Sequence, residues 1–385
     1  MNIKLYNKIS NKGLSRLDKS LYTCSEDVEN PDGILVRSAK LHDIEFNKEL
    51  KAIVRAGAGV NNIPIDRCSE AGIVVFNTPG ANANAVKELV FAGMLLSARP
   101  VFDAMSWVET LNGDEDVATL VEKEKSKFVG NEIRGKKIGI IGLGAIGIKV
   151  ANLALHFGME VYGYDPYISI DAAWQLSRKV HYAKTLDELY EKCDYISIHV
   201  PLNGKTKNMI NDDAIAKMKD NVCILNFARG GLVDEDAVCT ALDEGRMKNY
   251  VCDFPNGNIL HKKGVICIPH LGASTPESED NCAIMAADQL SDFLENGNIL
   301  NSINLPNLTL DRSGEARITC FHKNTPNMIA QISQTISGEG INIENLINKS
   351  KDEYAYTMVD VNSKSLDAVI AKLDAVDDIL KVTQL

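Results

Sequence analysis

The chain of 385 residues lacks the features that mark several common classes of protein. It has no basic excess, since 41 Lys and Arg face 52 Asp and Glu, for a net charge of −11. This charge argues against a broad nucleic-acid or anionic-membrane surface, so an anionic ligand would need a locally basic pocket. No apolar run reaches the roughly eighteen residues that a membrane helix needs, and the amino terminus has no signal-peptide core. We expect a cytoplasmic protein without nucleic-acid or membrane partners.

The cysteines also lack a pattern. None of the nine forms a CxxC pair, and their spacing is not typical of a zinc site or a disulfide framework. Reduced, buried thiols in a cytosolic protein are the expected state, with no bound metal. The composition, 45% hydrophobic and 24% charged, is ordinary for a globular protein, and the length allows two or three domains with separate cores.

The most informative stretch is residues 140–166, where an apolar strand, three spaced glycines, a helix and a second strand follow one another. Gly142 allows a tight turn, Gly144 lets a pyrophosphate approach the backbone, and Gly147 lets the helix lie close to the sheet. Asp165 ends the second strand, where its carboxylate would accept hydrogen bonds from ribose hydroxyls and repel a 2′-phosphate. The stretch predicts a Rossmann-type site for NAD rather than NADP. Ala145 and Ile146, at the start of the helix, are also expected to bind the cofactor.

The order of expected strands and helices along the chain predicts three domains. Residues 1–97 alternate short strands and helices, and a long helical pattern after residue 276 is expected to return to this part, giving a discontinuous, flavodoxin-like substrate domain of 1–97 and 276–305. Residues 98–275 continue the doubly wound nucleotide domain, with parallel strands whose loops gather at one edge. After a linker, residues 315–385 have the strand-helix-strand-strand-helix-strand order of a small ferredoxin-like domain.

Three polar residues follow strands of the predicted nucleotide sheet. The guanidinium of Arg229 would hold a carboxylate bidentately near the nicotinamide end of NAD. A neutral His270 would take the proton of a hydroxyl as hydride leaves the same carbon. Asp253 is placed to bind the cofactor amide. Each of the three, taken alone, could equally be an ordinary surface or capping residue. Their convergence on one edge of the sheet favours a functional role.

The motifs GLGAIG, YDP, HVPL, NFARGG and PHLGAST, in this order, resemble the D-2-hydroxyacid dehydrogenase family over almost the whole chain. The resemblance implies oxidation of a small anionic 2-hydroxy acid, here 3-phosphoglycerate, with Arg229 binding the carboxylate and His270 exchanging the proton. It places Arg55 and the amides near Gly57 at the substrate, with Arg37 as a second phosphate ligand or, alternatively, a structural ion pair. Further positions that match the cofactor-lining residues of the family are Thr78, Pro201, Thr206, Ala228 and Gly272.

One departure from the family is a missing glutamate. The family places a glutamate after the strand-end aspartate to pair with the catalytic histidine, whereas residues 254–269 contain no Asp or Glu. Glu277 or Glu279 would substitute from the following helix, but both also read as solvated first-turn charges favoured by the helix dipole.

The carboxyl-terminal segment FHKNTPNM resembles the ligand loop of an ACT domain. The resemblance implies that His322, Asn324 and Asn342 bind L-serine as an effector, and that the chain forms a homodimer or homotetramer. Asn327 stands where a glycine is usual, and Asn tolerates the left-handed conformation better than most residues. The alternatives are a purely structural domain here and, for the whole chain, another D-2-hydroxyacid dehydrogenase or a non-catalytic NAD-sensing protein.

Overall fold

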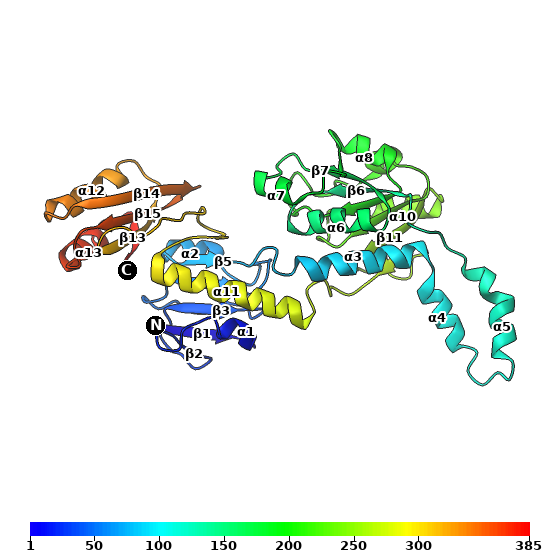
Figure 1. Cartoon of the computed structure of the whole chain (residues 1–385), viewed down its shortest axis with the longest axis horizontal. Coiled ribbons are helices and arrows are strands. Elements are labelled where there is room, and N and C mark those ends of the chain that lie inside the picture. Colours follow the sequence, from blue (N-terminus) through cyan, green and yellow to red (C-terminus); the bar gives the residue numbers. More distant parts are fainter. The chain divides into compact units, whose positions relative to one another are not determined.

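The computed structural model describes all 385 residues, which form two compact units. The first unit combines Met1–Asn82 with Pro276–Leu385, and the second is Ala83–Thr275 (Figure 1). The division falls before the expected limit at residue 97, because helix α3 (Ala83–Ala98) packs its apolar side chains into the core of the second unit. The finer division into three domains stays a proposal.

The second unit is built on a seven-stranded sheet in which all paired strands are parallel. The strand order is β12-β11-β10-β9-β6-β7-β8, so the direction of winding reverses between β6 and β9. Doubly wound sheets bind ligands at such a reversal, outside the carboxyl ends of the strands. The strands are β6 (Lys137–Ile141), β7 (Glu160–Tyr164), β8 (His181–Tyr182), β9 (Tyr195–Ile198), β10 (Val222–Asn226), β11 (Met247–Cys252) and β12 (Val265–Cys267).

Both faces of this sheet are covered, as its continuous apolar strands require. Helices α3 and α6 (Ala145–His156) pack on one face. On the other lie α8 (Leu186–Lys192), α9 (Asp212–Ala216) and α10 (Glu235–Asp243), and a short helix, α7 (Ile170–Gln175), follows β7. The predicted Rossmann-type fold is confirmed.

A helical arm projects from the end of α3 and was not predicted. It consists of α4 (Val101–Glu109) and α5 (Val117–Glu124), seen in Figure 1, and the turn η1 (Lys125–Phe128). None of these elements has a buried residue. No single helix of the chain is long and apolar enough to cross a membrane; α3 and α4 pass that test only as a pair bent by 70°.

The first unit contains a parallel sheet of order β2-β1-β3-β4-β5. Helix α11 (Pro276–Asn296) packs on one face and α2 (Ile65–Glu70) on the other, so the segment after Pro276 does return to the amino-terminal strands. The other elements are β1 (Asn2–Tyr6), α1 (Asn11–Leu14), β2 (Thr23–Ser25), β3 (Gly33–Val36), β4 (Ala52–Arg55) and β5 (Val74–Phe76).

The carboxyl-terminal part of this unit has the predicted ferredoxin-like order, in an antiparallel sheet β14-β15-β13-β16. Its elements are β13 (Ala316–Lys323), α12 (Met328–Gly338), β14 (Ile343–Lys351), β15 (Tyr354–Val361), α13 (Asp367–Asp374) and β16 (Ile379–Gln384). Both helices cover one face, while Phe321, Tyr356 and Met358 on the other face join the core beneath α11. Asn327 adopts φ +72°, so the left-handed turn expected of it is present.

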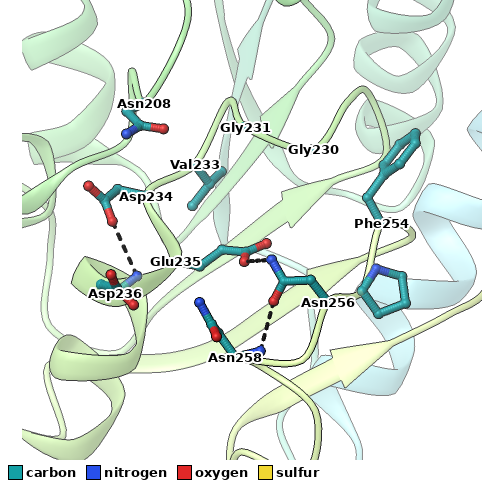
Figure 2. A pocket seen from close by; sticks show the side chains of 11 residues that line it. Asn208, Gly230, Gly231, Val233, Asp234, Glu235, Asp236, Phe254, Asn256 and Asn258 are labelled. Carbon is teal, nitrogen blue, oxygen red and sulfur yellow. Dashed lines mark hydrogen bonds between the residues drawn. The ribbon is translucent and has the colours of Figure 1, made fainter.

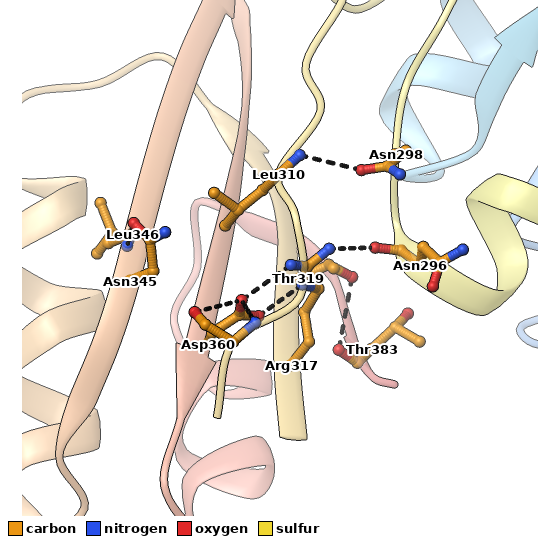
Figure 3. Close-up of polar contacts among 10 residues, drawn as sticks. Asn296, Asn298, Leu310, Arg317, Thr319, Asn345, Leu346, Asp360 and Thr383 are labelled. Atoms are coloured by element: carbon orange, nitrogen blue, oxygen red, sulfur yellow. Dashed lines mark hydrogen bonds and ion pairs between the residues drawn. The ribbon is translucent and has the colours of Figure 1, made fainter. Parts of the chain in front are cut away.

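A fully buried ion pair lies on the face of this sheet turned toward α11 (Figure 3). Arg317 donates from Nε and Nη2 to the two carboxylate oxygens of Asp360, at 2.6 and 2.9 Å, and from Nη1 to the Asn296 carbonyl at 2.7 Å. Ser313 N–H adds a further hydrogen bond to Asp360 at 2.8 Å. Burial alone would raise the pKa of Asp360, but the bonds from Arg317 and Ser313 hold it below the ordinary value.

Candidate functional site

The glycine-rich turn between β6 and α6 leaves backbone amides open to a ligand. Gly142 has φ +92°, and a Cβ there would lie 2.6 Å from the His199 carbonyl oxygen. A Cβ on Gly147 would lie 1.9 Å from the Gly142 carbonyl oxygen, whereas one on Gly144 would meet no atom within 4 Å. The two outer glycines are therefore needed for the fold of the turn. Gly144 instead keeps open space at the first turn of α6, where N–H groups favour an anion.

Asp165 follows β7 and is held beside this turn. Its Oδ2 accepts a hydrogen bond from Leu143 N–H and its Oδ1 one from Tyr167 N–H, both at 2.8 Å. Each carboxylate oxygen has a further lone pair, so the group can still accept from two ribose hydroxyls. The geometry thus fits the adenosine end of a dinucleotide.

Three neighbouring strands, β12, β11 and β10, deliver His270, Asp253 and Arg229. In a parallel sheet their carboxyl ends meet at one edge, so the three residues leave the sheet side by side. Arg229 is exposed, with Nη1 donating to the Ala228 carbonyl at 2.7 Å, and Asn226 Nδ2 fixes its loop through the Arg229 carbonyl at 3.0 Å.

Asp253 lies buried at the carboxyl edge of the seven-stranded sheet. It is 2% exposed, and its Oδ1 has no hydrogen-bond partner within the protein. Burial raises its pKa to about 6, despite the nearby positive charge of Arg229. A Cβ on Gly272 would lie 3.8 Å from Asp253 Oδ2, so this glycine leaves room beside the carboxylate. Buried polar atoms are rarely left unpaired, and the orphaned oxygen fits a donor brought by a ligand, such as a carboxamide.

His270 is exposed, and its ring packs on Phe254, with ring centroids 4.5 Å apart and planes at 46°. A Cβ on Gly230, next to Arg229, would lie 3.5 Å from Phe254 Cβ. Phe254 therefore contacts the ring of His270 and lies beside the loop that carries Arg229. Sequence reasoning missed this residue; its position directly after Asp253 was the available signal.

The loop after β9 holds the other predicted cofactor residues. Thr206 Oγ1 donates to the Pro201 carbonyl at 2.6 Å and accepts from Asn203 N–H at 2.8 Å, so it closes the turn. His199, also missed, shares a 2.8 Å hydrogen bond with Ser197 Oγ, and burial lowers its pKa to about 4. A neutral imidazole thus lies behind the glycine turn.

A pocket of about 540 Å³ opens beside Phe254 and the loop that follows it (Figure 2). Asn256 Nδ2 donates to Glu235 at the start of α10, and Asn256 Oδ1 accepts from Asn258 N–H at 2.9 Å. Burial raises the pKa of Glu235. The side chain of Asn256 therefore ties this loop, which lacks the family's glutamate, to α10.

The predicted substrate residues lie in the first compact unit. Arg55 Nε donates to the Arg37 carbonyl at 3.0 Å, and Gly57 N–H to the Arg55 carbonyl at 2.9 Å. Arg37 Nη2 pairs with Glu279 Oε1 at 2.5 Å, in agreement with a structural ion pair as the role of Arg37. The carboxylate of Glu279 is therefore paired with Arg37.

Thr78, a predicted cofactor residue, also lies in the first unit. It is fully buried, and its N–H donates to the Gly57 carbonyl at 3.1 Å.

The three predicted effector residues do not form one site within a single chain. His322 is buried, with Nε2 bonded to Thr357 Oγ1 and Nδ1 to the Lys323 carbonyl, both at 2.8 Å. Asn324 Nδ2 donates to the Asp352 carbonyl at the β14–β15 turn. Asn342 lies at the opposite end of β14, where its N–H donates to Asn362 Oδ1.

The fold and this edge together define a dinucleotide-binding protein of the doubly wound class. Residues 91–272 match the family of the D-isomer specific 2-hydroxyacid dehydrogenase, NAD binding domain, and residues 311–383 match the ACT domain. The chain is 39% identical, over 67% of its length and 83% of the relative's, to the hydroxypyruvate reductase of Thermotoga maritima. It belongs to the D-2-hydroxyacid dehydrogenase family, and the predicted NAD-binding domain is confirmed.

Two further similarities are with phosphoglycerate dehydrogenases. The D-3-phosphoglycerate dehydrogenase of Methanocaldococcus jannaschii is 37% identical over 76% of this chain and 55% of its own length. The crystal structure of NAD⁺-bound 3-phosphoglycerate dehydrogenase from Entamoeba histolytica is 28% identical, covers 79% of this chain and 98% of its own, and has a TM-score of 0.61. The chain spans between 50% and 63% of the length of the first curated relatives that it matches.

Proposed function

We propose that the chain is an NAD-dependent dehydrogenase that oxidises 3-phosphoglycerate to 3-phosphohydroxypyruvate, the first step of serine synthesis. The observation that carries the proposal is the convergence of Arg229, Asp253 and His270 from three adjacent strands on the carboxyl edge of an NAD-binding sheet. The similarity to phosphoglycerate dehydrogenases supports the choice of substrate.

The residues of the nucleotide unit fit NAD. The amides at Gly144 would hold its pyrophosphate, Asp165 its adenosine ribose and Asp253 Oδ1 its carboxamide, because these are the open, oriented or orphaned groups. NAD, when bound, supplies the hydride acceptor. Ala145, Ile146, Thr78, Pro201, Thr206, Ala228 and Gly272 remain proposed as the lining of the cofactor site.

His270 would act as the general base at the substrate hydroxyl, since its exposed imidazole stands on the same edge as Arg229. The guanidinium of Arg229 would hold the substrate carboxylate through two parallel hydrogen bonds and polarise the adjacent oxygen. Arg55 and the amides near Gly57 remain proposed to bind the substrate anion, as the resemblance to the family implies. For Arg37 the ion pair with Glu279 favours a structural role.

Steady-state kinetics with NAD and a panel of 2-hydroxy acids tests this function. We expect the highest kcat/KM for 3-phosphoglycerate, above D-glycerate and D-lactate, and a raised KM for Arg229→Lys because one ammonium cannot reproduce the guanidinium fork. The second candidate is a hydroxypyruvate reductase, favoured by the similarity to the Thermotoga protein. A preference for D-glycerate and hydroxypyruvate would establish it, and NAD binding without any turnover would establish an NAD sensor instead.

The carboxyl-terminal domain is proposed to bind L-serine in an assembly of two chains. Strand β14 is the edge of its sheet, so a second copy could pair with it in antiparallel register. That pairing would bring Asn342 of one chain toward Asn324 of the other, which a single chain does not do. Calorimetric titration with serine, repeated on Asn342→Ala, tests the site; a domain that binds no serine would be an assembly element only.

The exposed arm supports a homo-oligomer. Phe102 and Met105 of α4 are 73% and 64% exposed, and Val101 and Val108 on the same helix are also exposed. An apolar patch of this kind marks a protein interface. Light scattering of the wild type and of Phe102→Ser with Met105→Ser would show whether the arm holds the oligomer together.

A further inference from the structure

The surroundings of His270 contain a group that the proposed mechanism has not used. In the second unit, the ring of Phe254 lies 4.5 Å from the imidazole of His270, centroid to centroid. The same side chain lies beside Gly230, where an added Cβ would make ordinary contact, at 3.5 Å from Phe254 Cβ and 3.9 Å from its Cγ. One aromatic side chain thus contacts the ring of His270 and lies beside the backbone of the loop that carries Arg229.

Packing alone does not fix this ring. Phe254 is only half-buried, and it lines the pocket of about 540 Å³ rather than a filled core. The loop after it is restrained by the side chain of Asn256, which donates to Glu235 and accepts from Asn258 N–H (Figure 2), and by the fully buried side chain of Ile259. The loop thereby has a defined course although it carries no carboxylate of its own.

We propose that Phe254, held by the Asn256–Glu235 tether, is a positioning residue for His270. This inference rests on the proposed function of His270 as the general base. The tilted ring would restrict the imidazole to orientations that serve proton transfer, and its π-electrons would favour the imidazolium that forms when His270 takes the proton. Because Phe254 also lies beside Gly230, next to Arg229, its ring would limit movement of the base toward the Arg229 fork.

The first test replaces the ring and keeps the apolar volume. Phe254→Leu is expected to lower kcat by about tenfold, because a small misplacement of a catalytic group is costly. The acidic limb of its kcat/KM profile should move to lower pH by about half a unit, since the imidazolium loses its aromatic partner. Phe254→Tyr should retain both properties. Phe157→Leu, which removes a ring of the same unit that stacks on Phe91 at 5.0 Å, is the matched control and should be unchanged.

The second test does not need turnover. The rate at which diethyl pyrocarbonate modifies His270, followed by mass spectrometry in the protein without cofactor, should rise several-fold in Phe254→Leu and in Asn256→Ala. Wild-type modification rates in both variants would overturn the inference, as would equal losses of kcat in Phe254→Leu and Phe254→Tyr. The proposed function fails separately, through an inactive wild type or a fully active His270→Ala.

Discussion

Two buried aspartates, one in each compact unit, show opposite solutions to the same physical problem. Asp360 on the ACT sheet is fully buried, receives two hydrogen bonds from Arg317 and one from Ser313 N–H, and has a lowered pKa. Asp253 at the edge of the nucleotide sheet is 2% exposed, has an unpartnered Oδ1, and has its pKa raised to about 6 by burial.

The difference separates structural from functional use of a buried charge. A carboxylate whose acceptors are all engaged stabilises the fold as long as its partners remain, and losing one partner leaves an uncompensated charge. A carboxylate left short of partners lowers stability and is tolerated where a ligand supplies the missing donor. The ACT sheet face therefore packs against α11 through a structural ion pair, whereas the carboxyl edge of the nucleotide sheet is the proposed site.

The largest effect on this comparison is expected from a substitution of Arg317. Arg317→Met should destabilise the first unit by about 3–5 kcal/mol, because it leaves Asp360 charged and buried without its partner. The measurement is the fall in the thermal midpoint. Arg317→Met combined with Asp360→Leu should recover much of the loss. Lys323 lies on the same strand as Arg317 and forms an exposed ion pair with Asp378, so Lys323→Met should change little. Equal midpoints for Arg317→Met and Lys323→Met would contradict the structural role of the buried pair.

The second largest effect is expected at the functional edge. His270→Ala should lower kcat by roughly 10²-fold or more, as loss of a general base does, with little change in the thermal midpoint because the side chain is exposed. Turnover and melting are measured on the same preparation, with His42→Ala, another exposed histidine, as the control. Near wild-type turnover in His270→Ala would remove this residue from the mechanism.

The third prediction is a gain of stability, whereas the first is a loss. A raised folded-state pKa means that the folded protein holds the proton of Asp253 more tightly than the unfolded chain, so the stability from this group is present at low pH and is lost as pH rises through about 6. Asp253→Asn removes that loss. At pH 8 it should raise the stability of the second unit by about 2 kcal/mol, and the gain should shrink toward pH 5.

Asp253→Asn should also weaken NAD binding, because a neutral amide replaces the carboxylate whose Oδ1 lacks a partner. Thermal midpoints at both pH values and calorimetric titration with NAD give the two readouts, and Asp220→Asn, at an exposed aspartate, is the control. Asp360 has the opposite pH dependence, since its stabilisation is present above the ordinary carboxyl pKa and is lost as pH falls through the lowered value. A loss of stability at pH 8 in Asp253→Asn would refute the contrast between the two aspartates.

The sequence predicts what depends on local pattern. The alternation of short strands and helices predicts the parallel sheets, and glycine spacing with Asp165 predicts the nucleotide turn. The carboxyl-terminal element order also follows from local alternation of apolar and polar residues.

Contacts between distant segments are what the sequence cannot supply. Arg317 reads as the exposed position of an alternating strand, and only the packing of that sheet face against α11 buries it beside Asp360, 43 residues away. Glu279 lies 242 residues from Arg37, so their ion pair has no local signal. The arm of α4 was missed because its apolar side chains lie on the surface rather than against a core. The contact between Phe254 and His270 likewise depends on two loops that meet only in the folded sheet.

The smallest predicted effect concerns a third aspartate, which lies between the two cases. Both oxygens of Asp165 accept backbone hydrogen bonds, as in a structural carboxylate, yet the group stays half-buried beside the open glycine turn, as in a site. Its charge should oppose a 2′-phosphate, giving a kcat/KM for NAD at least about tenfold above that for NADP, or about 1.4 kcal/mol. Asp165→Ser with Tyr167→Arg should bring the two values within about threefold, because an arginine can accommodate the 2′-phosphate. Asp171→Ser, on α7, removes an exposed charge and should leave the ratio unchanged. Equal values for NAD and NADP in the wild type would mean that Asp165 serves only to hold the turn through Leu143 and Tyr167.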